Sequence, residues 1–351
     1  MSVKFEPVIW NWTKIGYDLV LLALITAYIF VYLRVAPDFQ DVTRPINGQT
    51  LRMQAFGTLA FLMLTAILCI GPLARMDKRF LPLLYNRRHF GVLTCAVAFV
   101  HVGHVLGWYF AFSPIDRYEA LLISNTSFGQ VLGFPFEVFG MISLFLLLVL
   151  ALTSHDFWLD FLTPPVWKII HMSVYFAYFA LVLHVGVGYL QDTQSSVFSY
   201  VVGASVFVVA GLHYAASRRE AKVETPSEVS TVGWLVAGTL DDTIDGLALI
   251  VRPSGGDRIA VFRHANKLSA ITNVCAHQNG PLGEGRVIDG CVTCPWHGFQ
   301  YDPETGRAPP PFTEKIATYN LKLDGSRILV DPTPNAPGTR TTPIVIPECA
   351  P

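Results

Sequence analysis

The chain has 351 residues, of which 52% are hydrophobic and 15% are charged, and its formal net charge at pH 7 is -1. So apolar a composition lies outside the usual range of a soluble globular domain, and it predicts a membrane protein in contact with lipid. The near-zero net charge gives no indication of a nucleic-acid partner, and none is expected.

Six apolar segments are long enough to cross a hydrocarbon core of about 30 Å. They are residues 16–35, 53–74, 91–112, 134–153, 168–190 and 196–215. The first segment contains Asp18 and lacks the small-residue cleavage site of a signal peptide, so it is expected to remain as a helix. The sequence therefore predicts a six-helix transmembrane bundle.

The loops between these segments differ in their basic residues. One set of alternate loops holds eleven, which are Lys4, Lys14, Arg75, Lys78, Arg79, Arg87, Arg88, Lys168, Arg218, Arg219 and Lys222. The other set holds four, which are Arg34, Arg44, Arg52 and Arg117. Because Lys and Arg accumulate on the cytoplasmic side, this difference predicts a multi-pass inner-membrane protein with both termini in the cytoplasm.

The character of the chain changes after the bundle, which is assigned to residues 1–216. Residues 217–230 are charged and are expected to form a linker without compact structure. Residues 231–331 contain short alternating segments such as "LALIVRP" and "RIAVFRH", which are typical of β-strands. Residues 332–351 are Pro-rich and are expected to be an extended or disordered tail. The predicted fold class is a membrane all-α six-helix bundle followed by a small all-β domain.

Two of the predicted spans carry more than one histidine within the segment or at its start. One has His89, His101 and His104, and the other has His171 and His184. Ionisable side chains inside a bilayer are costly, so each histidine is a functional candidate, although a single one can simply be hydrogen-bonded between helices. His89 and His171 lie near the cytoplasmic ends of their segments, at similar depth.

The other three histidines lie deeper. His101 and His104 follow Arg88 by 13 and 16 residues, and His184 follows Lys168 by 16 residues. Either His101 or His104 can therefore face His184 in the outer half of the bundle. Two imidazoles from facing helices could ligate a haem axially.

Two Cys/His pairs lie in the predicted β domain. They are Cys275-x-His277 and Cys294-x-x-His297. A thiolate and an imidazole on each of two tight loops suit a [2Fe-2S] cluster with two Cys on one iron and two His on the other. Zinc is the alternative, but zinc sites usually pair Cys with Cys and His with His, and the mixed pairs argue against it.

The stretch around these pairs resembles a Rieske domain. The matching motifs are "GPL" at residues 280–282, "CPWHGFQYD" at residues 294–302 and the prolines at residues 309–311. The resemblance covers roughly residues 231–331. It implies that the four residues of the two pairs bind a Rieske [2Fe-2S] cluster.

The resemblance also bears on the cluster potential. Rieske proteins of quinol-oxidising complexes carry an extra cysteine in each loop and a serine that bonds a cluster sulfur. This chain has Gly280, Trp296 and Phe299 at those positions. Hydrogen bonds to cluster sulfurs raise the potential, so the loss of the serine predicts a value toward the bottom of the Rieske range, about -150 mV. Tyr301 can keep one such bond.

The helical part resembles the ferric reductase-like transmembrane family, and is similar to its bacterial branch that includes the haem subunit of the methionine sulfoxide reductase system. The matching stretches are "FGTLAFLMLTAILCIGPLARM", "RRHFGVL" and "LALTSHDFW", within about residues 50–190. The resemblance implies haem b, with ligands that carry over to His101, His171 and His184. Two-haem members place a further histidine where this chain has Arg87. His89 is therefore either the ligand of a second haem or an interfacial side chain.

A cluster and a haem in one chain predict transmembrane electron transfer, as an oxidoreductase or an electron-transfer subunit. The chain has no G-x-G-x-x-G nucleotide-binding loop, so a cytoplasmic reductase or ferredoxin-type partner is implied. By analogy with the resembled family, electrons are expected to pass from the cluster through the haem to a periplasmic or quinone-linked acceptor.

Three alternatives remain open at this point. Electrons could instead flow from quinol through the haem, so that the Rieske domain serves as an anchored ferredoxin for a cytosolic oxygenase. A redox or nitric oxide sensor is an alternative from another class, although the sequence shows no recognisable output domain. The helical bundle could also be a histidine-lined transporter.

Overall fold

The computed structural model describes residues 12–39, 46–126, 130–131, 133–155, 158, 161–162, 164–192, 196–223, 227–230, 233–277, 279–295 and 298–346. The chain divides into two compact units. The helical unit comprises Trp10–Pro72 and Asn86–His213. The β unit comprises Met1–Ile9, Leu73–Tyr85 and Tyr214–Pro351. The domain boundaries given by the sequence stay predictions.

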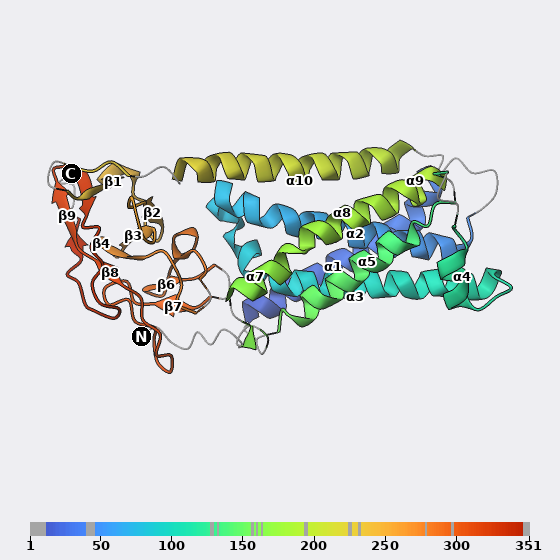
Figure 1. Ribbon diagram of the computed structural model, residues 1–351, viewed down its shortest axis with the longest axis horizontal. Helices are drawn as coiled ribbons and strands as arrows, with labels where there is room; N and C mark the ends of the chain where they lie inside the picture. The colour runs from blue at the N-terminus through green and yellow to red at the C-terminus, as the bar shows by residue number, and fades with distance from the viewer. Residues whose placement is uncertain are drawn as a thin grey trace. The chain divides into compact units, whose positions relative to one another are not determined.

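The helical unit is built from helices (Figure 1). They are α1 (Trp12–Val35), η1 (Ala36–Phe39), α2 (Gly48–Met76), α3 (Leu81–Phe112), α4 (Arg117–Ile123), α5 (Glu137–Leu152), α7 (Pro164–Met172), α8 (Val174–Val187), α9 (Tyr189–Asp192) and α10 (Ser196–Val223). The ends of α2, α3 and α10 belong to the β unit, together with the short helix η2 (Lys78–Phe80).

Five helical segments in the described part of the chain are long and apolar enough to cross a membrane. They are Ile15–Asp38, Gly48–Met76, Asn86–Phe112, Val166–Gln191 and Ser196–Ala221. The fold class is confirmed, but the predicted count of six spans is not exact. The segment 134–153 contains only α5, whose 16 residues extend about 24 Å at 1.5 Å per residue, less than a bilayer core. Pro135 explains the difference, because proline disfavours helical geometry in the residue before it and helix begins only at Glu137.

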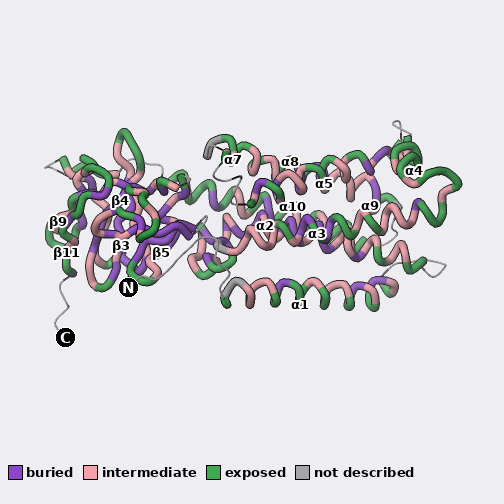
Figure 2. The backbone as a smooth tube through the Cα atoms, turned by 90° about the horizontal axis from the view of Figure 1, so that it is seen from below, coloured by how far each residue is buried: buried purple, intermediate pink, exposed green. Residues whose placement is uncertain are grey.

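Large apolar side chains cover the outside of the helical unit. Phe110 and Phe207, for example, are 71% and 79% exposed, and α1 is mostly exposed or half-buried along its length (Figure 2). Small residues lie inside, where Ala55 and Ala177 are fully buried and allow the helices to approach closely. This distribution fits a bundle whose outer surface meets lipid.

The β unit contains three antiparallel sheets. Their strands are β1 (Leu235–Thr239), β2 (Ala248–Val251), β3 (Ile259–His264), β4 (Lys267–Thr272), β5 (Arg286–Ile288), β6 (Cys291–Thr293), β7 (Gln300–Tyr301), β8 (Thr318–Tyr319), β9 (Leu321–Asp324), β10 (Arg327–Val330) and β11 (Ile344–Val345). The sheet orders are β1-β10-β9, β11-β4-β3-β2 with β8 also on β4, and β5-β6-β7. The first two sheets form the body of the unit, and the third carries the second cysteine loop.

Two tight hairpins fix the register of these sheets. Ala265 and Asn266 join β3 to β4 with φ of 45° and 59°, and Asp289 and Gly290 join β5 to β6 with φ of 51° and 78°. Positive φ at both central residues is the signature of a type I′ turn, whose twist matches that of the flanking strands. The second hairpin sets β6 against β5 and so positions Cys294, the residue that follows β6.

Two segments expected to lack compact structure are ordered where they are described. Helix α10 continues through residues 217–223, because "SRREAK" contains good helix formers and no Gly or Pro. In the Pro-rich segment, residues 332–346 are extended and pack on the β unit. Strand β11 pairs with β4, and Thr341 N–H donates to the Glu304 carbonyl at 2.9 Å. The last five residues lie outside the described part.

We expect Gly306→Ala to destabilise the β unit more than Gly325→Ala does. Both glycines have positive φ, 65° and 59°, so each alanine carries a left-handed backbone penalty of about 1–2 kcal/mol. Only at Gly306 would a Cβ also overlap the carbonyl oxygen of Ile316. Hydrogen exchange of the full chain should show faster exchange of β7 and β8 amides in Gly306→Ala. Equal exchange in the two variants would contradict this account.

Candidate cofactor sites

The two cysteines of the predicted cluster site lie in loops with the same backbone turn. Cys275 N–H donates to the carbonyl five residues on, that of Gly280, at 2.9 Å, and Asn279 N–H donates back to the Cys275 carbonyl at 2.7 Å. In the second loop Cys294 N–H donates to Phe299 and Gly298 N–H donates to Cys294, both at 2.8 Å.

A positive φ closes each turn at the fourth position after the cysteine. Asn279 has φ of 57° and Gly298 has φ of 73°, and Asn and Gly are the residues that adopt this geometry most readily. The sequence reasoning missed this equivalence, although an Asn or Gly four residues after each cysteine was its signal.

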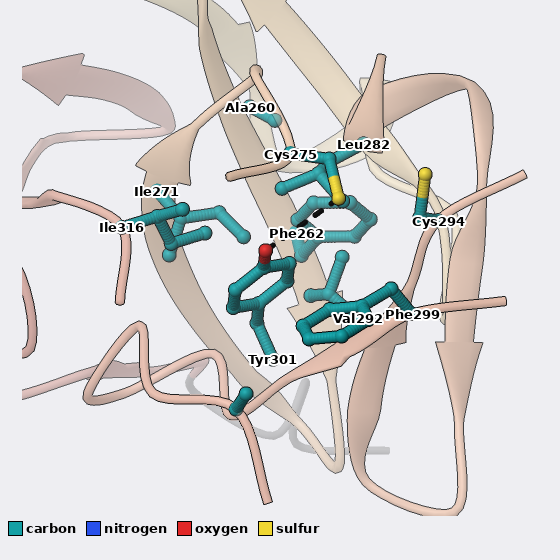
Figure 3. Close-up of a cluster of buried hydrophobic side chains, with 11 residues drawn as sticks. Ala260, Phe262, Ile271, Cys275, Leu282, Val292, Cys294, Phe299, Tyr301 and Ile316 are labelled. Atoms are coloured by element: carbon teal, nitrogen blue, oxygen red, sulfur yellow. Dashed lines mark hydrogen bonds between the residues drawn. The ribbon is translucent and has the colours of Figure 1, made fainter. Parts of the chain in front are cut away.

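The cysteine side chains lie at the edge of a buried core. Cys275 and Cys294 are each 1% exposed and neither is in a disulfide. Figure 3 shows their sulfur atoms at the same end of a cluster that includes Phe262, Phe299 and Tyr301. The arrangement presents two thiols together without joining them.

The side chain of His277 stacks on that of Phe299. Its ring lies 4.9 Å from that of Phe299, with the planes 6° apart. His297, the fourth predicted ligand, and Trp296 lie outside the described residues. Among the described residues, which leave out His297, no group of three or more His, Cys, Asp or Glu has metal-binding spacing.

Tyr301 supplies a hydrogen bond to the first cysteine. Its hydroxyl lies 3.5 Å from Cys275 Sγ and the side chain is fully buried. Burial raises the pKa of Tyr301 well above its usual value, and a charged Cys275 raises that pKa further. The phenol therefore stays protonated, and its O–H donates a hydrogen bond to Cys275 Sγ.

The helical unit encloses a cavity of about 880 Å³. It is lined mainly by apolar side chains of α1, α2, α3, α5, α8 and α10, and His101 and His184 face each other within it. Their ring centroids are 6.5 Å apart and their planes are 78° apart. The two imidazoles therefore come close to each other from separate helices.

Each of the two histidines is held in the same way. His101 Nδ1 donates to the Met53 carbonyl and His184 Nδ1 donates to the Phe136 carbonyl, both at 2.9 Å. Such bonds fix the tautomer and leave the Nε2 lone pair available to a metal.

A glycine follows each of these carbonyl residues after four positions. A Cβ at Gly57 would lie 2.9 Å from the His101 ring, and a Cβ at Gly140 would lie 2.8 Å from the His184 ring. Both contacts are too close for a real side chain. The glycines therefore let each imidazole lie directly against the neighbouring helix.

The residues that line the cavity recur in the sequence, because many lining residues have a counterpart 83 positions further along the chain that also lines the cavity. Residues at equivalent positions of the α2–α3 hairpin and the α5–α8 hairpin line the cavity together. The pairs include Met53/Phe136, Gln54/Glu137, Gly57/Gly140, Ala60/Ser143, Ala98/Leu181 and His101/His184. The sequence showed no repeat, because few of these pairs conserve the residue type.

The other three histidines lie outside the cavity wall. His104 stacks on Phe56. The depth of the residues left open whether His101 or His104 faces His184, and in the structure it is His101. His171 Nε2 lies 3.2 Å from Thr153 Oγ1. His89 Nδ1 lies 2.8 Å from Asp18 Oδ2.

One polar group in the cavity wall was missed by sequence reasoning. Glu137, at the start of α5, is only 7% exposed and lines the cavity. It accepts hydrogen bonds from the Tyr109 hydroxyl at 2.9 Å and from the Asn125 amide. A carboxyl group at the edge of an apolar segment was the available signal.

Comparisons with known proteins agree with both units. The sequence matches the family model of the Rieske [2Fe-2S] domain over residues 234–320 and that of the ferric reductase like transmembrane component over residues 56–182. These matches confirm the two predicted resemblances.

Individual relatives match the β unit. The anthranilate 1,2-dioxygenase ferredoxin subunit of Burkholderia cepacia is 36% identical over 108 residues, which are 30% of this chain and 97% of that protein. The ferredoxin component of the naphthalene 1,2-dioxygenase system of Pseudomonas putida is 30% identical over 102 residues, 29% of this chain and 97% of that protein. A solved ferredoxin of carbazole 1,9a-dioxygenase from Nocardioides aromaticivorans IC177 is 28% identical over 28% of this chain and 98% of that chain, with a TM-score of 0.27.

The molecule is thus a membrane protein with an attached redox domain. It belongs to the Rieske [2Fe-2S] family through that domain, which is joined to a ferric reductase-like transmembrane component, and its general function is electron transfer.

We expect Tyr301→Phe to lower the midpoint potential of the [2Fe-2S] cluster by tens of millivolts, on the order expected for one lost hydrogen bond near a cluster sulfur. The change removes only the hydroxyl that lies near Cys275 Sγ. An EPR-monitored redox titration measures the shift. Tyr319→Phe is the matched control, since its hydroxyl lies near Thr272, and it should leave the potential unchanged. An unshifted potential in Tyr301→Phe would show that the bond does not tune the cluster.

Proposed function

We propose that this protein carries single electrons between a Rieske [2Fe-2S] cluster and a haem b. Cys275, His277, Cys294 and His297 would hold the cluster. His101 and His184 would hold the haem. The observation that carries the proposal is the pair of facing imidazoles in the cavity, each with its Nδ1 on a backbone carbonyl.

The spacing of the two rings supports a shared metal ion. With about 2.0 Å for each metal–nitrogen bond and about 1.15 Å from nitrogen to ring centroid, an ion bound by both Nε2 atoms needs roughly 6.3 Å between centroids. The observed distance is 6.5 Å. A haem held by His101 and His184 would supply one-electron chemistry.

Two further features of the cavity fit a large planar group. Gly57 and Gly140 set the imidazoles back against the helices, which leaves the space between them clear. The buried Ser143 hydroxyl lines the cavity and has no hydrogen-bond partner within the described residues, so it can donate to a bound group. Unsatisfied hydroxyls are costly inside a membrane protein.

The contacts of the remaining histidines favour one haem. His171 was expected as a further ligand and His89 as a ligand of a second haem. His171 lies against Thr153 and Trp167, and His89 is paired with Asp18. The proposal therefore rests on the His101–His184 pair, and the roles of His89 and His171 stay predictions.

The surroundings of the cluster site support a low potential. Phe299 cannot donate a hydrogen bond, and it is buried between His277 and Phe312. Replacing it with serine would leave a cavity that costs about 3–5 kcal/mol, so the sequence-based expectation that Phe299→Ser raises the potential holds only if the loop keeps its shape.

Separate observations support outward and inward electron flow. The ferric reductase-like component favours outward flow from a cytoplasmic reductase or ferredoxin-type partner, through cluster and haem, to a periplasmic or quinone-linked acceptor. The ferredoxin components of dioxygenase systems found among the relatives favour inward flow from quinol to a cytosolic oxygenase. An optical and EPR redox titration of both centres distinguishes the two, since electrons move to the centre of higher potential.

Transfer between the two centres is tested by flash photoreduction of the purified full chain. A photoreductant delivers one electron to the cluster, and the haem absorbance is followed. We expect the haem to be reduced at the same rate as the cluster is reoxidised. This kinetic phase should be absent in Cys294→Ser and in His184→Ala. Cys69→Ser is the matched control, since Cys69 is a buried thiol outside both sites. Unchanged haem reduction in Cys294→Ser would refute the proposed path.

The two glycines beside the histidines provide a separate test of the haem site. We expect Gly57→Ala and Gly140→Ala to lower haem content severalfold, because each Cβ would displace an imidazole. Gly103→Ala is the control, since a Cβ at Gly103 meets nothing within 4 Å. The pyridine haemochrome assay measures haem per chain, and full haem content in both variants would contradict the ligand assignment.

The inner-membrane topology is also a proposal. The excess of basic residues in one set of loops supports cytoplasmic termini, with α5 crossing the membrane as a sixth, shorter helix, because both ends of a chain share one side only when the number of spans is even. A phosphatase reporter fused after residue 219 should be inactive and a fluorescent protein at the same position should be bright. An active phosphatase would place the cluster on the outer side.

A further inference from the structure

The wall of the cavity also contains a polar group that the proposed electron transfer does not use. Glu137 lies there with Tyr109 and Asn125, and all three side chains line the cavity. Tyr109 in α3 and Asn125 after α4 both donate to the same carboxyl oxygen, Oε1. The two bonds fix the orientation of the carboxyl group.

The second carboxyl oxygen is left for something else. Within the described residues, no hydrogen bond or ion pair reaches Glu137 Oε2. A carboxyl oxygen in an otherwise apolar cavity is costly unless it accepts a hydrogen bond. The wall is thus built to accept one donor from a molecule inside the cavity.

The internal repeat shows that the carboxyl group is not needed to build the wall. The position equivalent to Glu137 is Gln54, which follows Met53 directly as Glu137 follows Phe136 and also lines the cavity. An amide therefore serves the same structural position in the other hairpin. Only one of the two halves carries an acid, next to the carbonyl that holds His184.

We propose that the cavity binds the hydroxylated ring of a quinol beside Glu137, with one hydroxyl donating to Glu137 Oε2. A ligand that reaches a cavity among apolar helices must be lipid-soluble. It must also present a donor to the carboxyl group and flat apolar surface to side chains such as Trp108 and Phe136, which also line the cavity. A quinol has all three properties. The inference rests on the proposed function, since it makes the haem the electron acceptor.

The redox step balances with groups already assigned. Oxidation of one quinol to quinone releases two electrons and two protons. A haem held by His101 and His184 would accept these electrons singly, and a cluster held by the Cys275 and Cys294 loops would receive the first before the second is released. Glu137 Oε2 accepts the first hydroxyl proton, the second proton passes to water, and the quinone leaves into the lipid. This sequence corresponds to inward electron flow.

Binding is tested directly, without electron transfer, on the full chain in nanodiscs. The probe is 2-heptyl-4-hydroxyquinoline N-oxide, a stable hydroxylated quinol mimic whose fluorescence is quenched on binding. We expect saturable binding at one site per chain, weakened at least tenfold in Glu137→Gln. The fold-change follows from the loss of one hydrogen bond and from the donor that takes the place of the acceptor. Gln keeps an oxygen for Tyr109 and Asn125 but places an N–H₂ where Oε2 was.

Two further variants make the result specific. Glu119→Gln changes an exposed glutamate of the neighbouring helix α4 and should bind the probe like the unmodified chain. Tyr109→Phe keeps the carboxyl group but removes one of the bonds that orient it, and should weaken binding severalfold. Tyr109→Phe also serves if Glu137→Gln fails to fold.

The outcomes separate this inference from the proposed function. Equal affinity of the unmodified chain and Glu137→Gln, or the absence of saturable binding, would overturn the quinol site. Flash-driven transfer between cluster and haem would still be observed in that case. Loss of that transfer with probe binding intact would instead refute the proposed function. With both intact, a short-chain quinol should reduce the haem about tenfold more slowly in Glu137→Gln, at unchanged haem content.

Discussion

A membrane interior offers no water to polar groups, so each polar side chain in the helical unit must find its partner within the protein. The two histidines of the cavity meet this constraint through backbone carbonyls that lie on the neighbouring helices, Met53 for His101 and Phe136 for His184. Each bond leaves one ring nitrogen for a ligand. The glycines one turn further on make these approaches possible. The geometry of the cavity therefore follows from how two imidazoles are satisfied in an apolar bundle.

The β unit solves a different problem, which is to present sulfur at the edge of a core without exposing it. Both cysteine loops close through the same pair of backbone hydrogen bonds, although their sequences, "CAHQNG" and "CPWHGF", share little. The backbone turn fixes Cys275 and Cys294, while Phe299 and Tyr301 fill the space behind them. Side chains that pack the core thereby also determine how polar the surroundings of the sulfur atoms are.

Much of this organisation could be predicted from the sequence, and the exceptions have physical causes. The hydropathy pattern located the helices and the β domain, because helices in contact with lipid require long apolar segments and half-buried strands require alternating apolar residues. Counting residues from basic loop ends placed His184 near His101 or His104 in depth, but depth carries no information on helix rotation, which decides that His101 faces the cavity. The length of α5 was overestimated, since hydropathy continued past Pro135 where helical geometry does not.

The residues around the cavity were harder to predict. Glu137 stood out weakly, because a carboxyl group next to a helix start is common, and its significance depends on Tyr109 and Asn125, which are distant in the chain. The 83-residue repeat was invisible to inspection, since packing constrains the size and position of side chains more than their identity. His297 lies outside the described residues, so its prediction rests on the motif alone.

The repeated wall of the cavity bears on facial selectivity. Two walls built alike present similar surfaces to the two faces of a flat ligand, so the shared residues do not determine which face of the ligand meets which wall. That choice falls to the positions where the walls differ. Some of them, such as Met53/Phe136 and Ala98/Leu181, differ in size, whereas Glu137 replaces Gln54 and Ser143 replaces Ala60. The acid and the hydroxyl both belong to the α5–α8 hairpin, so a near-symmetric pocket distinguishes the two faces of a ligand through the polar side chains of one wall.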